Sequence, residues 1–251
     1  MDPIEKKQRV GLLVPSSNST QEPEFVQALP ASVSLHVTRL GLASVDPEST
    51  LKVVADLESE SRKLADADVD IIVLAATAPS TRMGKGYDAQ LVKRIEDATG
   101  KRATTAATAM LEAFAALEIR RVALAAPWAA QTNAVVAAFL QAHGIAVVSQ
   151  VAMEVTRNND IGRLAPQTAF EHGLQADREE ADAVFLACGN WWTAAIVERL
   201  EAATGKPVLT TNNMAIWAVL RTLGGHASVP GLGRLLRTMP PLPAPTAARA
   251  A

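Results

Sequence analysis

The chain repeats itself, because short apolar segments of its first half return at a constant distance in its second half. VGLLVP at residues 10–15 corresponds to VALAAP at residues 122–127, 112 positions later. The same distance relates IIVLAATA at residues 71–78 to AVFLACGN at residues 183–190. Apolar strand segments also resemble one another by chance, but a distance kept over two motifs favours an ancient duplication. A third pair, residues 98–114 and 203–219, follows at a distance of 105.

Each repeat alternates strand-like and helix-like segments. Nearly continuous apolar runs predict parallel strands buried on both faces at residues 9–15, 69–76, 120–127, 145–152, 181–188 and 206–211. Apolar residues three and four apart predict helices at residues 49–67, 87–100, 106–119, 131–144 and 193–205. Alternation of this kind is typical of an α/β fold with right-handed crossovers.

We therefore predict an α/β fold of two pseudo-symmetric, doubly wound parallel-sheet halves. Residues 9–117 and 212–238 make the first half, residues 118–211 make the second, and residues 239–251 form a flexible tail rich in proline and alanine. Ligands of such sheets bind beyond the carboxyl ends of the strands, so we expect the active site in the cleft between the halves. The distance of 112 places Cys188, the only cysteine, at the position of Ala76 in the first half.

Composition and charge exclude several classes of protein. Apolar residues make up 49% of the chain and charged residues 20%, as in ordinary globular proteins. The net charge of −2 provides no basic field for nucleic acid or an anionic membrane surface. The sequence has no apolar signal core at its N-terminus and no apolar run long enough to span a membrane. We expect a cytoplasmic protein, either monomeric or a homo-oligomer.

Familiar cofactor and hydrolase motifs are missing from the sequence. It contains no G-x-G-x-x-G after a strand, no Walker A lysine motif and no G-x-S-x-G elbow. The four histidines are scattered without metal-ligand spacing, at His36, His143, His172 and His226. The sequence therefore gives little support to a metal, nucleotide or serine-hydrolase site.

Hydroxyl, amide and small residues follow the predicted strands. PSSNST at residues 15–20 offers donors for an anion, or forms an ordinary helix N-cap. RNNDIGR at residues 157–163 brings Asn158 or Asn159 to a carboxylate, or forms a surface turn. Trp128, Trp191 and Trp192 also follow strand ends, where they wall a pocket or simply pack. The predicted substrate-binding residues are Ser16, Ser17, Asn18, Ala76, Thr77, Ala78, Trp128, Asn158, Gly189 and Asn190.

Cys188 is the candidate catalytic residue. A lone cysteine is more often a small buried hydrophobe than a catalyst. Its place at a strand end before Gly189, in a cleft of anion donors, favours catalysis. Neighbouring backbone N–H groups would stabilise a thiolate or an adjacent oxyanion.

The duplicated halves and several motifs resemble the aspartate/glutamate racemase superfamily, in the branch of maleate cis–trans isomerases and arylmalonate decarboxylases. The resemblance runs from about Arg9 to Leu236. VPSSN and NNDIGRL are similar to the isomerases, whereas GLASVDPE, CG and VPGLGRLL are similar to the decarboxylases. The remaining matching motifs are GLLVPSSNSTQEPEF, RRVALAAPW with the TN that follows it, and ACGNWWT.

The resemblance implies chemistry without cofactor or metal. Racemases of this superfamily use one thiol from each half, and the isomerases are implied to attack maleate with the first-half cysteine. That position is Ala76 here, which can neither attack nor take a proton. The decarboxylases are similar in having only the second-half cysteine, which implies that Cys188 protonates an enediolate. The residues implied to hold the retained carboxylate are Thr77, Gly189, Asn190 and the 16–18 loop.

Two departures from the family pattern bear on the substrate. Trp128 stands where the family usually has a tyrosine, which removes a hydroxyl donor. Asn190, Trp191 and Trp192 follow the cysteine–glycine pair where the decarboxylases have small and aliphatic residues.

Three functions follow, in order of preference. The first is a cofactor-independent lyase that decarboxylates a malonate-type, arylmalonate-like diacid, with Cys188 protonating the enediolate. The second is a maleate isomerase-like enzyme with Ala76 in place of its first cysteine. The third is a non-catalytic carboxylate-binding protein. Each takes a small dicarboxylate as its partner, and none uses nucleic acid or a membrane.

Overall fold

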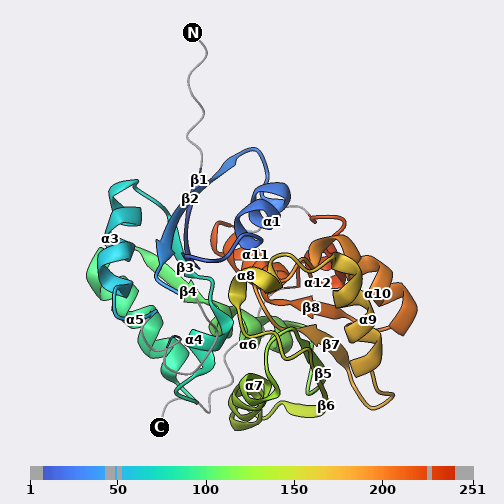
Figure 1. Ribbon diagram of the computed structural model, residues 1–251. Helices are drawn as coiled ribbons and strands as arrows, with labels where there is room; N and C mark the ends of the chain where they lie inside the picture. The colour runs from blue at the N-terminus through green and yellow to red at the C-terminus, as the bar shows by residue number, and fades with distance from the viewer. Residues whose placement is uncertain (1–7, 43–48, 50–52, 225–227, 241–251) are drawn as a thin grey trace.

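The computed structural model describes residues 8–42, 49, 53–224 and 228–240 of the chain (Figure 1). Two four-stranded parallel sheets form its framework, with orders β2-β1-β3-β4 and β6-β5-β7-β8. The first holds β1 (Gln8–Pro15), β2 (Val33–Leu40), β3 (Ile71–Leu74) and β4 (Arg102–Thr105). The second holds β5 (Arg121–Ala126), β6 (Ala146–Ala152), β7 (Ala183–Leu186) and β8 (Val208–Thr210). The predicted α/β fold and its repeat are confirmed by this shared strand order.

Helices flank both sheets. Those of the first part of the chain are α1 (Gln21–Ala28), α3 (Leu57–Asp66), α4 (Thr77–Thr81), α5 (Tyr87–Thr99) and α6 (Ala106–Ala116). Then follow α7 (Ala130–Ala142), α8 (Asn158–Ile161), α9 (Pro166–Ala176), the 3-10 turn η1 (Ala194–Ile196) and α10 (Val197–Thr204). The last are α11 (Thr211–Thr222) and α12 (Gly233–Thr238). The predicted helices are all present, although α3 starts later than the pattern suggested.

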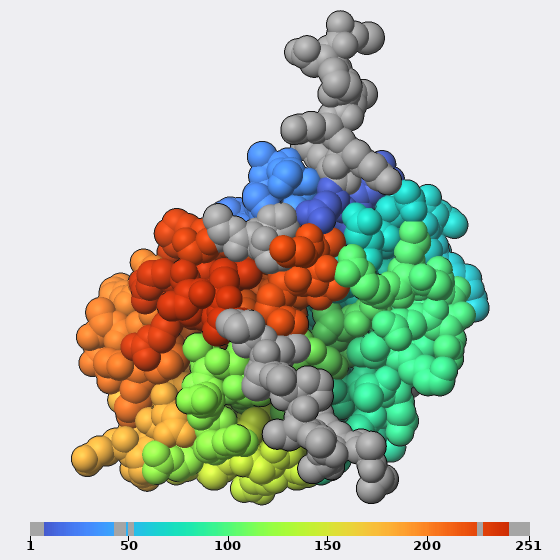
Figure 2. All heavy atoms as spheres, turned by 180° about the vertical axis from the view of Figure 1, so that it is seen from behind, coloured from blue at the N-terminus to red at the C-terminus, as the bar shows by residue number. Residues whose placement is uncertain are grey.

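One hydrophobic cluster spans both sheets, and a second, smaller cluster lies between the first sheet and helices α3 and α5. Helices α6 and α11 pack against each other near the centre of the molecule (Figure 1). The Phe114 ring of α6 meets the Phe185 ring of β7 edge to face, with 5.6 Å between their centroids. From behind, orange and red atoms of the C-terminal quarter lie between the blue N-terminal segment and green residues of the middle (Figure 2). This contact holds the carboxyl ends of the two sheets toward one another.

The same cap begins both central helices. Thr105 accepts a hydrogen bond from Thr108 N at the start of α6, and Thr210 accepts one from Asn213 N at the start of α11. These threonines are 105 residues apart, the distance found in the third repeated pair. A side-chain oxygen at this position satisfies an N–H group that the helix leaves free.

The prediction missed two strands, both in the first sheet. Strand β2 lies at the sheet edge, where most of its side chains are partly exposed. Its sequence, VSLHVTRL, mixes apolar and polar residues and shows no continuous apolar run. Strand β4 has only four residues, RATT, and exposes its first. Edge strands lack the two-sided burial on which the apolar signal depends.

The division into halves stays a prediction. Helix α12, assigned from sequence to the first half, contacts α10 and β8 of the second sheet. Residues 43–48 of the GLASVDPE motif and residues 241–251 of the predicted tail lie outside the described residues, as does His226.

Candidate active site

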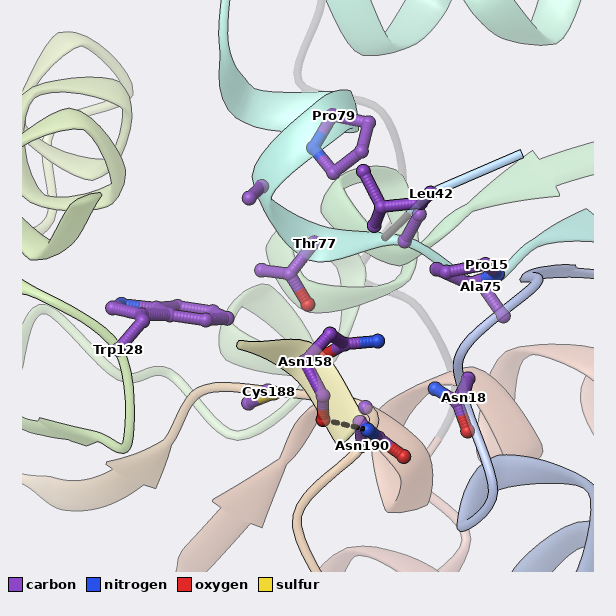
Figure 3. A pocket seen from close by; sticks show the side chains of 13 residues that line it. Pro15, Asn18, Leu42, Ala75, Thr77, Pro79, Trp128, Asn158, Cys188 and Asn190 are labelled. Atoms are coloured by element: carbon purple, nitrogen blue, oxygen red, sulfur yellow. Dashed lines mark hydrogen bonds between the residues drawn. The ribbon is translucent and has the colours of Figure 1, made fainter. Parts of the chain in front are cut away.

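A narrow cavity opens at the carboxyl ends of both sheets (Figure 3). Its volume is about 30 Å3. The lining residues are Pro15, Asn18, Leu42, Ala75, Ala76, Thr77, Ala78, Pro79, Trp128, Asn158, Cys188, Gly189 and Asn190.

Cys188 lies two residues beyond the end of β7, with its thiol at the cavity. Its φ of 155° lies in a region that is essentially reserved for glycine, so surrounding contacts must hold this backbone. One of them is the Cys188 N–H, which donates to Thr211 Oγ1 at 3.1 Å. Burial raises the pKa of the Cys188 thiol to about 12, against smaller opposing effects of the Asn190 and Trp191 backbone N–H groups. At neutral pH this side chain is therefore a thiol and not a thiolate.

The first sheet brings Ala76 and Thr77 to the same cavity. Ala76 is the N-cap residue of α4 and is 3% exposed. The sequence equivalence of Ala76 and Cys188 thus becomes proximity in space, with a methyl group from one sheet and a thiol from the other. The Thr77 hydroxyl lies 2.8 Å from the Thr211 hydroxyl. Thr211 was not among the predicted site residues.

Two asparagine amides face the cavity with one donor hydrogen each to spare. Asn18 donates one hydrogen to Gln21 Oε1 at 2.7 Å, and Asn158 donates one to Ser17 Oγ at 2.8 Å. Because an amide group carries two donor hydrogens, each keeps one for a ligand oxygen. Asn190 is oriented by two bonds, since its Oδ1 accepts from Ser19 N and its Nδ2 donates to Asn158 O.

Ser16 and Ser17, predicted to contact the substrate, are not among the residues that line the cavity. Both hydroxyls donate to the carbonyl oxygen of Leu42. They lie instead in a wider polar hollow of about 760 Å3, which shares Asn18 and Leu42 with the cavity. The serines thus shape the loop that carries Asn18. The hollow also holds Arg39, Arg157 and Asn159.

Of the three tryptophans predicted to follow strand ends, only Trp128 lines the cavity. Trp128 directs the benzene ring of its indole toward Thr77 and Cys188 (Figure 3). Its N–H points away and donates to Asn133 Oδ1 at 2.6 Å. Trp128 therefore offers the cavity hydrocarbon and no hydrogen-bond donor. Trp191 is fully buried, and the Trp192 N–H donates to Gly162 O.

A buried carboxylate holds the loop that follows Cys188. Glu24 of α1 is 3% exposed, and its Oε1 accepts from Thr193 N and Ala194 N at 2.9 Å each. Its Oε2 accepts from Asn212 Nδ2 at 2.6 Å, and the same amide donates to Gly189 O. Burial, the largest effect, raises the pKa of Glu24 above its ordinary value, although these hydrogen bonds oppose it. No motif or pattern in the sequence pointed to this role of Glu24.

Glu24→Gln is expected to remove a pH dependence of stability. The raised pKa means that the folded protein binds this proton more tightly, so wild-type stability falls as pH rises from about 4.5 through the raised value. The variant's stability should therefore improve relative to wild type over that window, by at most about 1.4 kcal/mol per pH unit. Urea unfolding between pH 4 and pH 8 measures the difference. Glu171→Gln, which replaces an exposed carboxylate, serves as the control. If the free energies of unfolding of Glu24→Gln and wild type changed in parallel with pH, the raised pKa of Glu24 would be contradicted.

Among the described residues there is no group of three or more histidine, cysteine, aspartate or glutamate side chains placed to hold a metal ion. None of the helices in that part of the chain is long and apolar enough to cross a membrane.

The sequence profile of the arylmalonate decarboxylase family (Amdase) matches residues 10–236. Maleate isomerase of Pseudomonas putida is 31% identical over 241 residues, 91% of this chain and 96% of the relative. Arylmalonate decarboxylase of Bordetella bronchiseptica is 28% identical, over 90% of this chain and 95% of the relative. A maleate cis–trans isomerase mutant of Nocardia farcinica with a covalently bound succinylcysteine intermediate superposes with a TM-score of 0.88, at 29% identity over 92% and 98% of the two chains. The chain belongs to the arylmalonate decarboxylase family, among relatives named both decarboxylase and maleate isomerase.

Proposed function

We propose that the protein is a cofactor-independent lyase that decarboxylates a malonate-type diacid bearing an aryl or similar apolar group. The observation that carries the proposal is the asymmetry of the cavity, where one sheet supplies the Cys188 thiol and the other the Ala76 methyl group. A single thiol suffices to protonate one face of a carbanion. It does not suffice for proton exchange between two faces.

In the proposed reaction the bond from the central carbon to one carboxylate breaks, and carbon dioxide leaves. The bonding electrons pass into the remaining carboxylate and give an enediolate. The central carbon then takes the proton of Cys188 Sγ, and the resulting thiolate recovers a proton from water. Carbon dioxide and a monocarboxylate are the products, and the reaction needs no external oxidant or reductant.

Neutral donors support the developing charge. Negative charge grows on the oxygens of the retained carboxylate, where preorganised hydrogen bonds stabilise the transition state. The Thr77 hydroxyl and the spare amide hydrogens of Asn18 and Asn158 are suited to this task. Because none of these groups is charged, they do not hold the departing carboxylate in an ion pair.

The rest of the lining suits an apolar substituent. Trp128 turns its hydrocarbon face to the cavity at the end opposite Asn18 (Figure 3), and Leu42, Ala78 and Pro79 add apolar surface. We infer that the substrate's side group packs here, since no side-chain donor of Trp128 is free to bind a second carboxylate.

The raised thiol pKa predicts how the rate depends on pH. With a pKa of about 12, Cys188 stays protonated through pH 10, so kcat should remain level from pH 7 to pH 10. A thiol of ordinary pKa would lose its proton over that range and lower kcat about 30-fold by pH 10. Initial rates with phenylmalonate measure the profile, with circular dichroism at each pH confirming that the protein is folded. A fall centred near pH 8.5 would show that the thiol is not desolvated during turnover.

Maleate isomerisation is the second candidate function. Its support is the number of relatives that are named maleate isomerase. The Nocardia farcinica isomerase with its succinylcysteine intermediate indicates that such an enzyme uses a nucleophilic cysteine. Cys188, protonated and buried, is poorly suited to attack a double bond. A carboxylate-binding protein without turnover is the third candidate.

One experiment separates the three candidates. Pure protein is incubated with phenylmalonate and, separately, with maleate in deuterated buffer and followed by proton NMR. Phenylacetate carrying one deuterium supports the decarboxylase, whereas fumarate without carbon dioxide release supports the isomerase. Binding of either diacid without turnover supports the third candidate.

A further inference from the structure

Thr211 lies behind the cavity and links its two halves through one oxygen atom. It is the first residue of α11 and is 2% exposed. Its Oγ1 accepts from the Cys188 N–H at 3.1 Å and lies 2.8 Å from Thr77 Oγ1. The three residues come from α4, the turn after β7 and the start of α11, so this link forms only in the folded chain.

The direction of the bond between the two hydroxyls follows from counting donors. An amide N–H only donates, so the Thr211 oxygen accepts from Cys188 and still has one hydrogen to place. Among the described residues Thr77 Oγ1 is the one acceptor recorded for that hydrogen. If Thr77 donated instead, the buried Thr211 hydrogen would have no acceptor, which is unfavourable. With Thr211 as the donor, the hydrogen left without a protein acceptor is that of Thr77, which lines the cavity and can meet water or a ligand oxygen there.

This direction leaves the Thr77 hydrogen free to point into the cavity. Thr77 lines the cavity, and in Figure 3 its hydroxyl oxygen faces the region of Asn158 and Cys188. Hydrogen bonds in such a chain polarise one another, so the Cys188 N–H and the Thr211 hydroxyl strengthen the Thr77 hydroxyl as a donor.

We propose that Thr211 is a positioning residue, which turns the Thr77 hydroxyl toward the anionic oxygens of the reacting substrate. The role of Thr211 in the reaction rests on the proposed function. The chain of hydrogen bonds through its hydroxyl rests on geometry alone. Thr211 does not touch the substrate. Its effect reaches the substrate through Thr77, whose hydrogen bond strengthens as the enediolate gains charge.

Thr211→Val keeps the shape of the side chain and removes the hydroxyl. We expect kcat for phenylmalonate to fall about 10- to 100-fold, the range for a hydrogen bond to a charged group, with KM changed much less. Thr211→Ser should restore most of the rate. Thr222→Val is the matched control on the same helix, and its rate should be unchanged. Among the described residues its hydroxyl bonds the Ala218 carbonyl oxygen alone.

A double-mutant cycle tests whether Thr211 acts through Thr77. If it does, Thr77→Val with Thr211→Val should be no slower than the slower of the two single variants. Additive losses would overturn the proposal, as would a Thr211→Val variant as fast as wild type. Circular dichroism and the melting temperature check folding, and Thr211→Ala replaces Thr211→Val if that variant does not fold.

A binding measurement tests the role of Thr211 even if the proposed decarboxylation is wrong. Benzylphosphonate carries two anionic oxygens beside an aryl group, and its Kd is measured by intrinsic tryptophan fluorescence. If wild type turns over neither diacid, the proposed function fails, yet the Kd should still rise about 10- to 100-fold in Thr211→Val and not further in the double variant. An unchanged Kd in Thr211→Val, or no binding to wild type, would overturn the inference.

Discussion

Replacing Cys188 by alanine is expected to lower kcat for phenylmalonate by about 10²- to 10⁴-fold, the range for loss of a general acid. The thiol reaches the cavity from the turn after β7, and burial keeps it protonated. Without the thiol, the enediolate takes its proton from water, which is slower. Initial rates followed by proton NMR measure the loss.

The stereochemistry of the residual reaction sharpens this test. With 2-methyl-2-phenylmalonate, wild type should give one enantiomer of 2-phenylpropionate, because Cys188 delivers its proton from one side. The small residual product of Cys188→Ala should be racemic. Full activity in Cys188→Ala, or an unchanged enantiomeric excess, would remove Cys188 from the mechanism.

Cys188→Ser controls for loss of packing around the sulfur. Serine keeps a similar volume, but its hydroxyl is a much weaker acid than a thiol. We expect a large fall in kcat with benzylphosphonate binding close to that of wild type. A variant that loses binding as well would indicate a structural role for the side chain.

The juxtaposition of Cys188 and Ala76 was predictable because both follow equivalent, deeply buried strands. The apolar runs of β3 and β7 fixed the repeat distance, and parallel topology required both strand ends to meet at one edge of the fold. Thr77 and Asn18, each three residues beyond a buried strand, followed by the same reasoning. Asn158 was predicted instead from the polar run RNNDIGR, and it lies six residues beyond the partly exposed edge strand β6.

The residues that hold the site in place could not be read from local pattern. Glu24 and Asn212 are 188 positions apart, and Thr77 and Thr211 are 134 positions apart, so each contact depends on how α11 packs. The run TTNN, with one threonine beyond the helix cap, was the only sequence signal of a second hydroxyl at this place.

Trp128 shows a different limit. The sequence places an aromatic residue after β5, but its chemistry at the cavity depends on which edge of the indole faces inward. Asn133, on the first turns of α7, accepts the indole hydrogen and donates its own amide to Val151 O. Strand β6 and helix α7 thus hold Asn133, and Asn133 holds the Trp128 indole. That the indole turns its hydrocarbon edge to the cavity is therefore a consequence of tertiary structure.

Ala76→Cys is expected to add a reaction that wild type lacks. Ala76 has φ −135° and ψ 103°, an extended conformation that cysteine adopts without strain. Its thiol would enter the cavity from the sheet opposite Cys188 and complete a pair of acid/base groups. Racemisation of 2-phenylpropionate should then rise about 10²- to 10⁴-fold above the wild-type rate, the range for general acid–base catalysis. Chiral chromatography of a single enantiomer over time measures it.

The new thiol also tests why this site carries only one. Because the cavity is narrow, the added sulfur should crowd the lining, and decarboxylation should slow by about 10-fold, as overpacking by 1–3 kcal/mol implies. Ala78→Cys places a thiol in the same cavity at a position without symmetry to Cys188, so it should crowd the site without racemising. Formation of fumarate from maleate by Ala76→Cys alone would show that a methyl group at this position is what separates lyase from isomerase chemistry. Equal racemisation by both variants would mean that position in the repeat does not matter, and that the duplicated strands set the fold and not the reaction.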